Sequence, residues 1–340
     1  MRLWKMYELK DKIIIEEIKN KKARRILIQL PEGLKKEANK IVKYIEENTE
    51  AKTFISGESC WGGCDLSLEE AKFLNVDLII HFGHAPFFKP NFPVVYVESR
   101  YNTDITKLVE SSLKNLGSYN KVGLVASVQH IHQLEKIKEI LEKNNKEAII
   151  PDKKGRAFYK GHILGCEYTG SKLIQEKVDC FLVLGNKFHS LGLALSVDKK
   201  VILIDPINEE IHDLDFEKKK VTLKRLELIE KARNAHTFGI IVSMKSGQQN
   251  FSVAENIKKK LEEDEKEAFI LTMNNITNDQ LVNFYNIDLF VNTSCPRISI
   301  EDTYQFDKPI INYTELLIAL DELKFDQEKN SIIIAPYGVE

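Results

Sequence analysis

A pattern of short apolar segments occurs three times along the 340-residue chain, and each copy leaves one cysteine in a loop. Each copy has four segments that are rich in Ile, Val and Phe and are bounded by Gly, Pro or Asp, with amphipathic stretches between them. Near-continuous apolar runs are typical of buried parallel strands, and the stretches between them have helical spacing. The copies therefore predict an α/β fold of three similar domains, each a small four-stranded, mostly parallel sheet flanked by helices, arranged about a pseudo-threefold centre.

Turn-forming and charged segments separate the three copies. Residues 111–120 are rich in turn residues, and residues 216–234 are typical of a charged helix whose lysine run forms a solvated face. The strongest amphipathic helices are predicted at residues 35–48, 131–144 and 251–264. The predicted domains are residues 1–110, 111–215 and 216–340.

The composition is that of a globular protein without a strongly charged surface. Hydrophobic residues make up 43% of the chain and charged residues 29%, and the formal net charge is only −2. No basic face for nucleic acid stands out, and no apolar run approaches the roughly 20 residues that span a bilayer. The first residues lack a signal-peptide core. We therefore expect a cytoplasmic protein that binds neither nucleic acid nor membrane.

The three outlying cysteines are the best candidates for metal ligands. Cys64 and Cys166 follow the second predicted strand of their copies, and Cys295 directly follows the third strand of its copy. Sites in open α/β sheets form at the carboxyl ends of the strands, so the three thiols converge if those ends face a common centre. Three thiolates can hold three irons of a [4Fe–4S] cluster and leave the fourth iron open to a substrate. Zinc would accept the same ligands.

The two remaining cysteines and three histidines are weaker candidates for a direct chemical role. Cys180 lies inside an apolar run and is expected to be an inert core thiol. Cys60, four residues before Cys64, is either a fourth ligand or a spectator. His81, His84 and His189 are placed at the ends of the third strands of the first two copies, where a capping or core role is favoured over direct chemistry.

A polar loop and an arginine are candidates for holding a ligand. The segment at residues 243–249 follows the first strand of the third copy, where α/β folds bind anionic groups, although it lacks the spacing of a P-loop. It offers Lys245, Gly247 and Gln248. Arg297 lies two residues after Cys295, and its planar fork can pair with a carboxylate or form a structural ion pair.

Four motifs in order along the chain resemble the archaeal diphthamide-synthesis enzymes, a family of non-classical radical S-adenosylmethionine proteins. The resemblance covers essentially the whole chain. Trp61 departs from the tyrosine that relatives often carry there, but it keeps an aromatic ring. The motifs are CWGGCD at residues 60–65, LGC at 164–166, SMKSGQ at 243–248 and NTSCPR at 292–297.

The resemblance implies a [4Fe–4S] cluster held by Cys64, Cys166 and Cys295, with no other catalytic residue. It implies that S-adenosylmethionine is cleaved to methylthioadenosine and a 3-amino-3-carboxypropyl radical. That radical then adds to C2 of one histidine imidazole on translation elongation factor two, the first step of diphthamide biosynthesis. It further implies a homodimer and an electron donor. On position and chemistry, Gln248, Arg297, Lys245 and Gly247 are our candidates for contacting S-adenosylmethionine.

Two other interpretations fit part of the pattern. Quinolinate synthase is similar in outline, since it has three α/β domains and a three-cysteine [4Fe–4S] cluster, but it acts on small acids without S-adenosylmethionine. The second is a non-enzymatic metal-binding scaffold. It is disfavoured because structural metal sites usually close with four ligands, whereas only three are well placed here.

Overall fold

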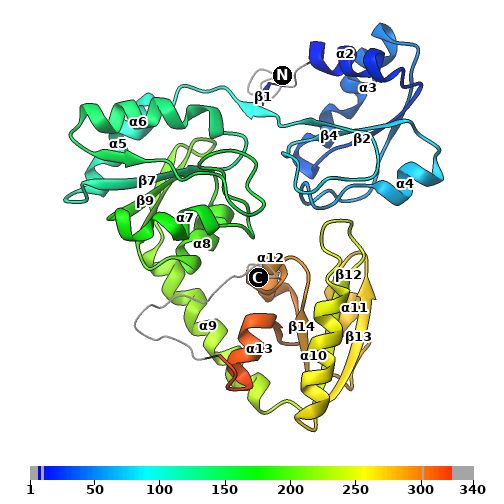
Figure 1. Cartoon of the computed structure of the whole chain (residues 1–340), viewed down its shortest axis with the longest axis vertical. Helices are drawn as coiled ribbons and strands as arrows, with labels where there is room; N and C mark the ends of the chain where they lie inside the picture. The colour runs from blue at the N-terminus through cyan, green and yellow to red at the C-terminus, as the bar shows by residue number, and fades with distance from the viewer. Residues whose placement is uncertain (1–6, 9–10, 301, 324–340) are drawn as a thin grey trace. The chain divides into compact units, whose positions relative to one another are not determined.

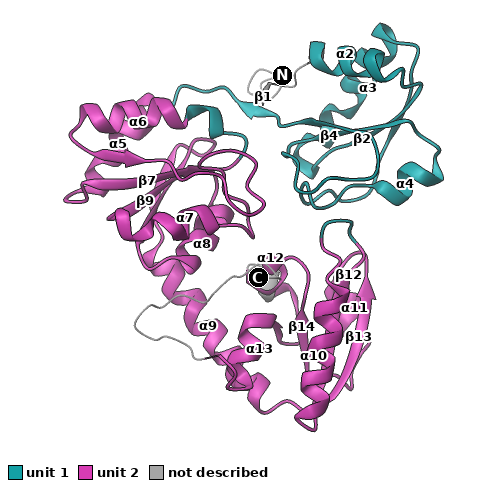
Figure 2. Ribbon diagram, in the orientation of Figure 1, with its two compact units in different colours: residues 1–105, 128–133, 245–247 teal, residues 106–127, 134–244, 248–340 magenta. Residues whose placement is uncertain are grey.

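The computed structural model describes residues 7–8, 11–300 and 302–323. Within these residues, three sheets of four or five strands follow one another along the chain (Figure 1). A short antiparallel pair joins β1 (Tyr7–Glu8) to β6 (Arg100–Tyr101). The chain divides into two compact units (Figure 2). Unit 1 comprises residues 1–105, 128–133 and 245–247, and unit 2 comprises residues 106–127, 134–244 and 248–340.

Unit 1 is built on a parallel sheet with the strand order β3-β2-β4-β5. Its strands are β2 (Arg25–Gln29), β3 (Lys52–Ile55), β4 (Leu78–Phe82) and β5 (Val94–Val97). Its helices are α2 (Asp11–Lys21), α3 (Ala38–Asn48) and α4 (Leu68–Phe73), with a 3₁₀ turn, η1, at Glu32–Glu37. Because α3 repeats apolar residues at helical spacing, it buries Ile41 and Ile45 in the same core as Ile26 of β2.

The second sheet, in unit 2, has the order β11-β10-β9-β7-β8. Its strands are β7 (Lys121–Ala126), β8 (Glu147–Ile149), β9 (Cys180–Leu184), β10 (Lys200–Asp205) and β11 (Glu210–Asp213). Its helical segments are α5 (Thr106–Leu116), α6 (Leu134–Lys143), α7 (Thr169–Ile174), η3 (Gln175–Lys177) and α8 (Lys187–Ser196). The 3₁₀ turn η2 (Ile131–Gln133), which directly precedes α6, belongs to unit 1. The antiparallel strand β11 adds to the four predicted strands. Asp205 starts the turn before it, accepting hydrogen bonds from the backbone N–H groups of Ile207 and Asn208.

The third sheet, also in unit 2, is parallel with the order β13-β12-β14-β15. Its strands are β12 (Thr237–Ser243), β13 (Glu267–Met273), β14 (Leu289–Asn292) and β15 (Ile310–Asn312). Its helical segments are α9 (Asp215–Arg233), α10 (Phe251–Glu263), α11 (Asn278–Leu281), α12 (Pro296–Ile300), η4 (Asp302–Gln305) and α13 (Tyr313–Ala319). The predicted α/β fold class is thus confirmed.

The three larger sheets fall inside the three predicted domain ranges, at residues 25–97, 121–213 and 237–312. Helix α5 runs across residue 110, and α9 begins at Asp215. The boundaries at residues 110 and 215 themselves stay a prediction.

The charged helix α9 is solvated on one side and buried on the other. Lys219 and Lys220 are exposed, as predicted for the lysine run. Arg225 on the same helix is only 1% exposed and forms an ion pair with fully buried Glu315 of α13, at 2.5 Å. This pair fixes α9 to the third sheet.

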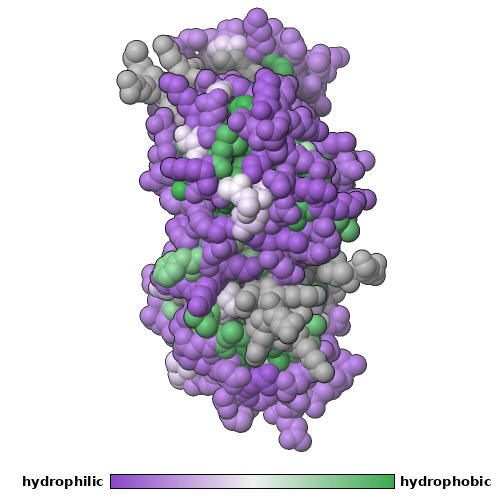
Figure 3. All heavy atoms as spheres, turned by 90° about the vertical axis from the view of Figure 1, so that its left-hand side faces the viewer, coloured by the Kyte–Doolittle hydropathy of each residue, from purple (hydrophilic) through white to green (hydrophobic). Residues whose placement is uncertain are grey.

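The surface of the face shown in Figure 3 is mostly hydrophilic, with hydrophobic residues in small separate groups. Among the described residues, no helix combines the length and apolar character that crossing a membrane requires.

Candidate metal centre

The loop that carries Cys64 lies between β3 and α4, at the carboxyl end of β2 in unit 1. A turn closes it, because the Asp65 N–H donates to the Gly62 carbonyl at 3.0 Å. Gln29, the last residue of β2, donates from its side-chain amide to the Asp65 carbonyl at 2.6 Å. The Asp65 carboxylate also accepts from the Trp61 N–H at 3.2 Å. The half-buried thiol of Cys64 therefore lies on a tightly held loop.

Residues 245–247 of unit 1 bind this loop directly. The Lys245 ammonium contacts both carboxylate oxygens of Asp65, at 3.0 and 2.9 Å, and both side chains are only 10% exposed. The Gly247 N–H donates to the Cys64 carbonyl at 2.7 Å. A Cβ at Gly247 would lie 2.7 Å from the Cα of Cys64, so the close approach requires glycine. Two predicted ligand-binding residues thus hold the Cys64 loop, and their contact with S-adenosylmethionine stays a prediction.

Cys166 lies at the tip of a tight turn between β8 and α7 in unit 2. Leu164 and Glu167 exchange backbone hydrogen bonds of 3.3 Å around it. The Glu167 carboxylate is buried and accepts from the backbone N–H groups of Arg156, at 3.0 Å, and Thr169, at 2.8 Å. These bonds fix the turn while the thiol stays half-buried.

Cys295 lies just before α12, which begins at Pro296. The side chain of Asn292 at the end of β14 shapes this connection, because it accepts from the Ser294 N–H at 2.9 Å and donates to the Cys295 carbonyl at 2.9 Å. Proline suits the first position of a helix, since its missing N–H has no intrahelical partner there. The Cys295 thiol is half-buried, like those of the other two predicted ligands.

Phe188 of α8 links the segments of Cys166 and Cys295 within unit 2. A Cβ at Gly165, next to Cys166, would lie 2.0 Å from the Phe188 ring. On α12, the Arg297 guanidinium lies 4.9 Å from the centroid of the same ring, a cation–π distance. No motif or spacing in the sequence indicates this role of Phe188. The convergence of Cys64 with Cys166 and Cys295 stays a prediction.

Two further predicted residues have clear positions in unit 2. Gln248 is buried, with 8% of its surface exposed. His189 was wrongly placed at a strand end, because β9 ends at Leu184 and His189 lies in the first turn of α8. Asn186 is the N-cap of that helix, because its side chain accepts a hydrogen bond from the His189 N–H at 3.2 Å. The last residues of the apolar run therefore begin a helix and do not continue the strand.

The other two cysteines are buried. Cys180 lies in β9 with no exposed surface, as predicted for a core thiol. Cys60 is 4% exposed, and burial raises the pKa of its thiol to about 12, with the Asp65 carboxylate acting in the same direction. Burial likewise raises the pKa of the Cys180 thiol to about 12. Among the five cysteines, all of which lie in the described part of the chain, only Cys64, Cys166 and Cys295 are partly exposed.

The donor set fits a metal that prefers sulfur ligands. Each of the three half-buried cysteines lies in a loop on the carboxyl-end side of the parallel strands of its sheet. Cysteine binds metal as the thiolate, and thiolates favour iron–sulfur clusters and zinc over magnesium or calcium. With three such ligands a [4Fe–4S] cluster keeps one iron open, whereas a structural zinc site would need a fourth ligand.

The sequence of this chain matches one family throughout most of its length. The sequence model of the diphthamide synthesis protein family covers residues 30–330. The 2-(3-amino-3-carboxypropyl)histidine synthase of Pyrococcus horikoshii is 34% identical over 331 residues, which are 95% of this chain and 94% of that protein. The synthase of Methanocaldococcus jannaschii is 28% identical over 95% of this chain and 94% of that protein.

Relatives also occur among eukaryotes and solved structures. Subunit 1 of the synthase from Kluyveromyces lactis is 27% identical, over 92% of this chain and 75% of that protein. The crystal structure of Dph2 from Pyrococcus horikoshii with a 4Fe-4S cluster matches with a TM-score of 0.86 and 33% identity. The match covers 98% of this chain and 96% of that chain.

Proposed function

Because the chain belongs to the diphthamide synthesis family, we propose that it transfers the 3-amino-3-carboxypropyl group from S-adenosylmethionine to a histidine of translation elongation factor two. The acceptor atom is C2 of the imidazole. The observation that carries the proposal is the placement of one half-buried cysteine in a carboxyl-end loop of each larger sheet, in a chain 34% identical to a named synthase. The relatives' names favour this reaction over a quinolinate-synthase-like dehydration or a scaffold role.

Cys64, Cys166 and Cys295 are the residues that hold a [4Fe–4S] cluster. When bound, the cluster supplies the electron that cleaves S-adenosylmethionine into methylthioadenosine and a 3-amino-3-carboxypropyl radical. The support is the donor chemistry of three thiols together with the 4Fe-4S cluster in the Pyrococcus horikoshii structure. The protein's own contribution is positioning, which the fixed loops around each cysteine provide.

Arg297 and Gln248 are the residues of unit 2 that contact S-adenosylmethionine. Arg297 carries a planar guanidinium that can bind the methionine carboxylate through two parallel hydrogen bonds. Its stacking on Phe188, at 4.9 Å, holds that plane beside the turn of Cys166. Gln248 directly follows Gly247, whose N–H donates to the Cys64 carbonyl. Lys245 and Gly247 hold the Cys64 loop and thereby help to position S-adenosylmethionine.

The remaining partners follow from the reaction. A reduced cluster requires an electron donor, and a protein substrate requires a site open to the surface. We further propose that the enzyme acts as a homodimer in the cytoplasm.

The test is transfer to the protein substrate. The cluster-loaded, dithionite-reduced protein is incubated anaerobically with S-adenosylmethionine and an archaeal elongation factor two, and the factor is analysed by intact and peptide mass spectrometry. We expect one added 3-amino-3-carboxypropyl group, located on one histidine, with an equal amount of methylthioadenosine. An unmodified factor in the presence of an intact cluster, or a group added to another residue type, would contradict the proposal.

A further inference from the structure

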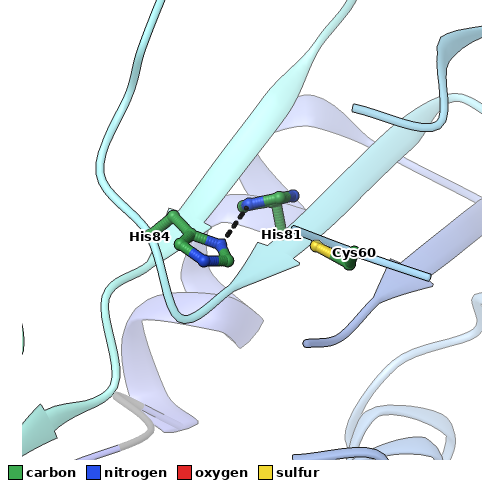
Figure 4. A group of neighbouring side chains, drawn as sticks. All are labelled: Cys60, His81 and His84. Carbon is green, nitrogen blue, oxygen red and sulfur yellow. Dashed lines mark hydrogen bonds between the residues drawn. The ribbon is translucent and has the colours of Figure 1, made fainter. Parts of the chain in front are cut away.

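Cys60, His81 and His84 form a compact group in unit 1 that the transfer reaction does not use. Their ligand atoms all lie within 4.8 Å of one another. His81 Nε2 lies 3.0 Å from His84 Nδ1, and the Cys60 thiol is beside them (Figure 4). His81 is fully buried, Cys60 is 4% exposed and His84 is half-buried. The three residues come from two segments, since Cys60 lies in the Cys64 loop and the histidines lie at the end of β4.

Gln29 fixes which nitrogen of His81 carries the proton. Its side-chain nitrogen donates to the Asp65 carbonyl at 2.6 Å, and its oxygen accepts from the Ser67 N–H at 3.3 Å, so the amide has one possible orientation. The same oxygen lies 2.9 Å from His81 Nδ1, which therefore donates a proton to it. His81 Nε2 is left with a lone pair that faces His84. Metal-binding histidines are commonly oriented in this way by a partner on the other ring nitrogen.

The donor set selects a class of metal. One thiol and two imidazoles suit zinc, iron(II) or cobalt(II), and they are poor ligands for magnesium or calcium. In a tetrahedral zinc site with Zn–N of about 2.0–2.1 Å, two nitrogen ligands lie about 3.3 Å apart. The present separation of 3.0 Å between His81 Nε2 and His84 Nδ1 therefore needs only a small opening.

We propose that Cys60, His81 and His84 bind one divalent transition-metal ion, separate from the [4Fe–4S] cluster. The ligand atoms are Cys60 Sγ, His81 Nε2 and His84 Nδ1. On binding, the Cys60 thiol releases its proton, and the proton of His84 Nδ1 moves to Nε2. A fourth ligand, such as a water molecule, would complete the tetrahedral coordination of the ion.

Such an ion joins the Cys64 loop to the end of β4. These segments already touch, because a Cβ at Gly63 would lie 2.5 Å from the Ala85 carbonyl oxygen. A metal bound at one end of the loop limits its movement while the Lys245–Asp65 pair holds the other end. The ion is thus expected to make the loop more resistant to unfolding.

The test is a cobalt(II) titration of the full-length chain in which Cys64, Cys166 and Cys295 are all replaced by alanine. These changes remove the cluster ligands, so the result is independent of the proposed reaction. We expect one cobalt ion per chain, with intense visible bands of tetrahedral cobalt and a thiolate-to-cobalt band in the near ultraviolet. Adding Cys60→Ala should abolish the thiolate band, and adding His84→Gln should weaken binding at least about tenfold.

Adding Cys180→Ala provides the matched control, because that thiol is equally buried but lies in β9, and it should leave the cobalt spectrum unchanged. Circular dichroism identifies any variant that fails to fold, and His84→Gln then serves as the second test of the site. The proposal is wrong if the parent variant binds no cobalt, or if the thiolate band survives in folded Cys60→Ala.

Discussion

Replacing Cys166 by alanine is expected to give a colourless, inactive protein, whereas the unchanged protein purified without oxygen is brown. The change removes one of three proposed thiolates, and two thiolates from distant loops are too few to hold a [4Fe–4S] cluster. The turn that carries Cys166 is held by Glu167 and by backbone bonds, so the fold should survive the loss of the thiol. The measurement is the iron and sulfide content per chain together with the charge-transfer absorption.

Cys180→Ala is the matched control for Cys166→Ala. It removes a thiol from the same unit, but one that is fully buried in β9, so the cluster absorption should persist. A brown Cys166→Ala protein with full iron content would show that this cysteine is not a ligand. A colourless unchanged protein with stoichiometric zinc would overturn the cluster assignment itself.

Glu315→Gln is expected to lower the free energy of unfolding by about 3–5 kcal/mol, because it leaves the Arg225 guanidinium buried without its counter-charge. Arg225 Nε donates to Glu315 at 2.6 Å, and the same guanidinium also binds the backbone carbonyls of Ser299 and Ile310. The Arg225 guanidinium therefore joins α9 to α13, α12 and β15. The measurement is urea denaturation of the full chain, followed by hydrogen exchange in α13 and β15.

Glu322→Gln is the control, because Glu322 pairs with Lys260 at the surface, where 41% and 33% of the two side chains are exposed. Surface pairs contribute about 0–1 kcal/mol, so this change should be nearly neutral. Replacing both Arg225 and Glu315 by apolar residues should recover much of the loss, since no buried charge then remains. If Glu315→Gln and Glu322→Gln lowered the free energy of unfolding by the same amount, this role of Arg225 would be contradicted.

Patterns carried by many residues were predictable from the sequence. Apart from the antiparallel strand β11, each of the three larger sheets consists of the four strands that its apolar segments predicted, because buried parallel strands need near-continuous apolar sequence. Helix α10 begins at Phe251 as predicted, and α3 is shorter only because η1 forms its first turn. These signals repeat along several residues, so no single side chain decides them.

Features decided by one side chain were missed or misplaced. Asn186 starts α8 and thereby moves His189 from a strand to a helix. Arg225 resembles the exposed charges around it, and only the tertiary contact with Glu315 buries it. Gln29 ends β2 in an apolar run, yet it orients both the Cys64 loop and His81. The contacts of Arg225 and Gln29 join residues distant in sequence, so local pattern and spacing carry no trace of them.

The measurement that tests the proposed function most directly is the fate of S-adenosylmethionine. The reconstituted, dithionite-reduced protein is incubated with it anaerobically, and the nucleoside products are separated by chromatography. We expect methylthioadenosine, which requires cleavage toward the 3-amino-3-carboxypropyl group and is lost in Cys64→Ala. Deoxyadenosine, or no cleavage by a protein whose cluster is intact, would contradict the proposed reaction.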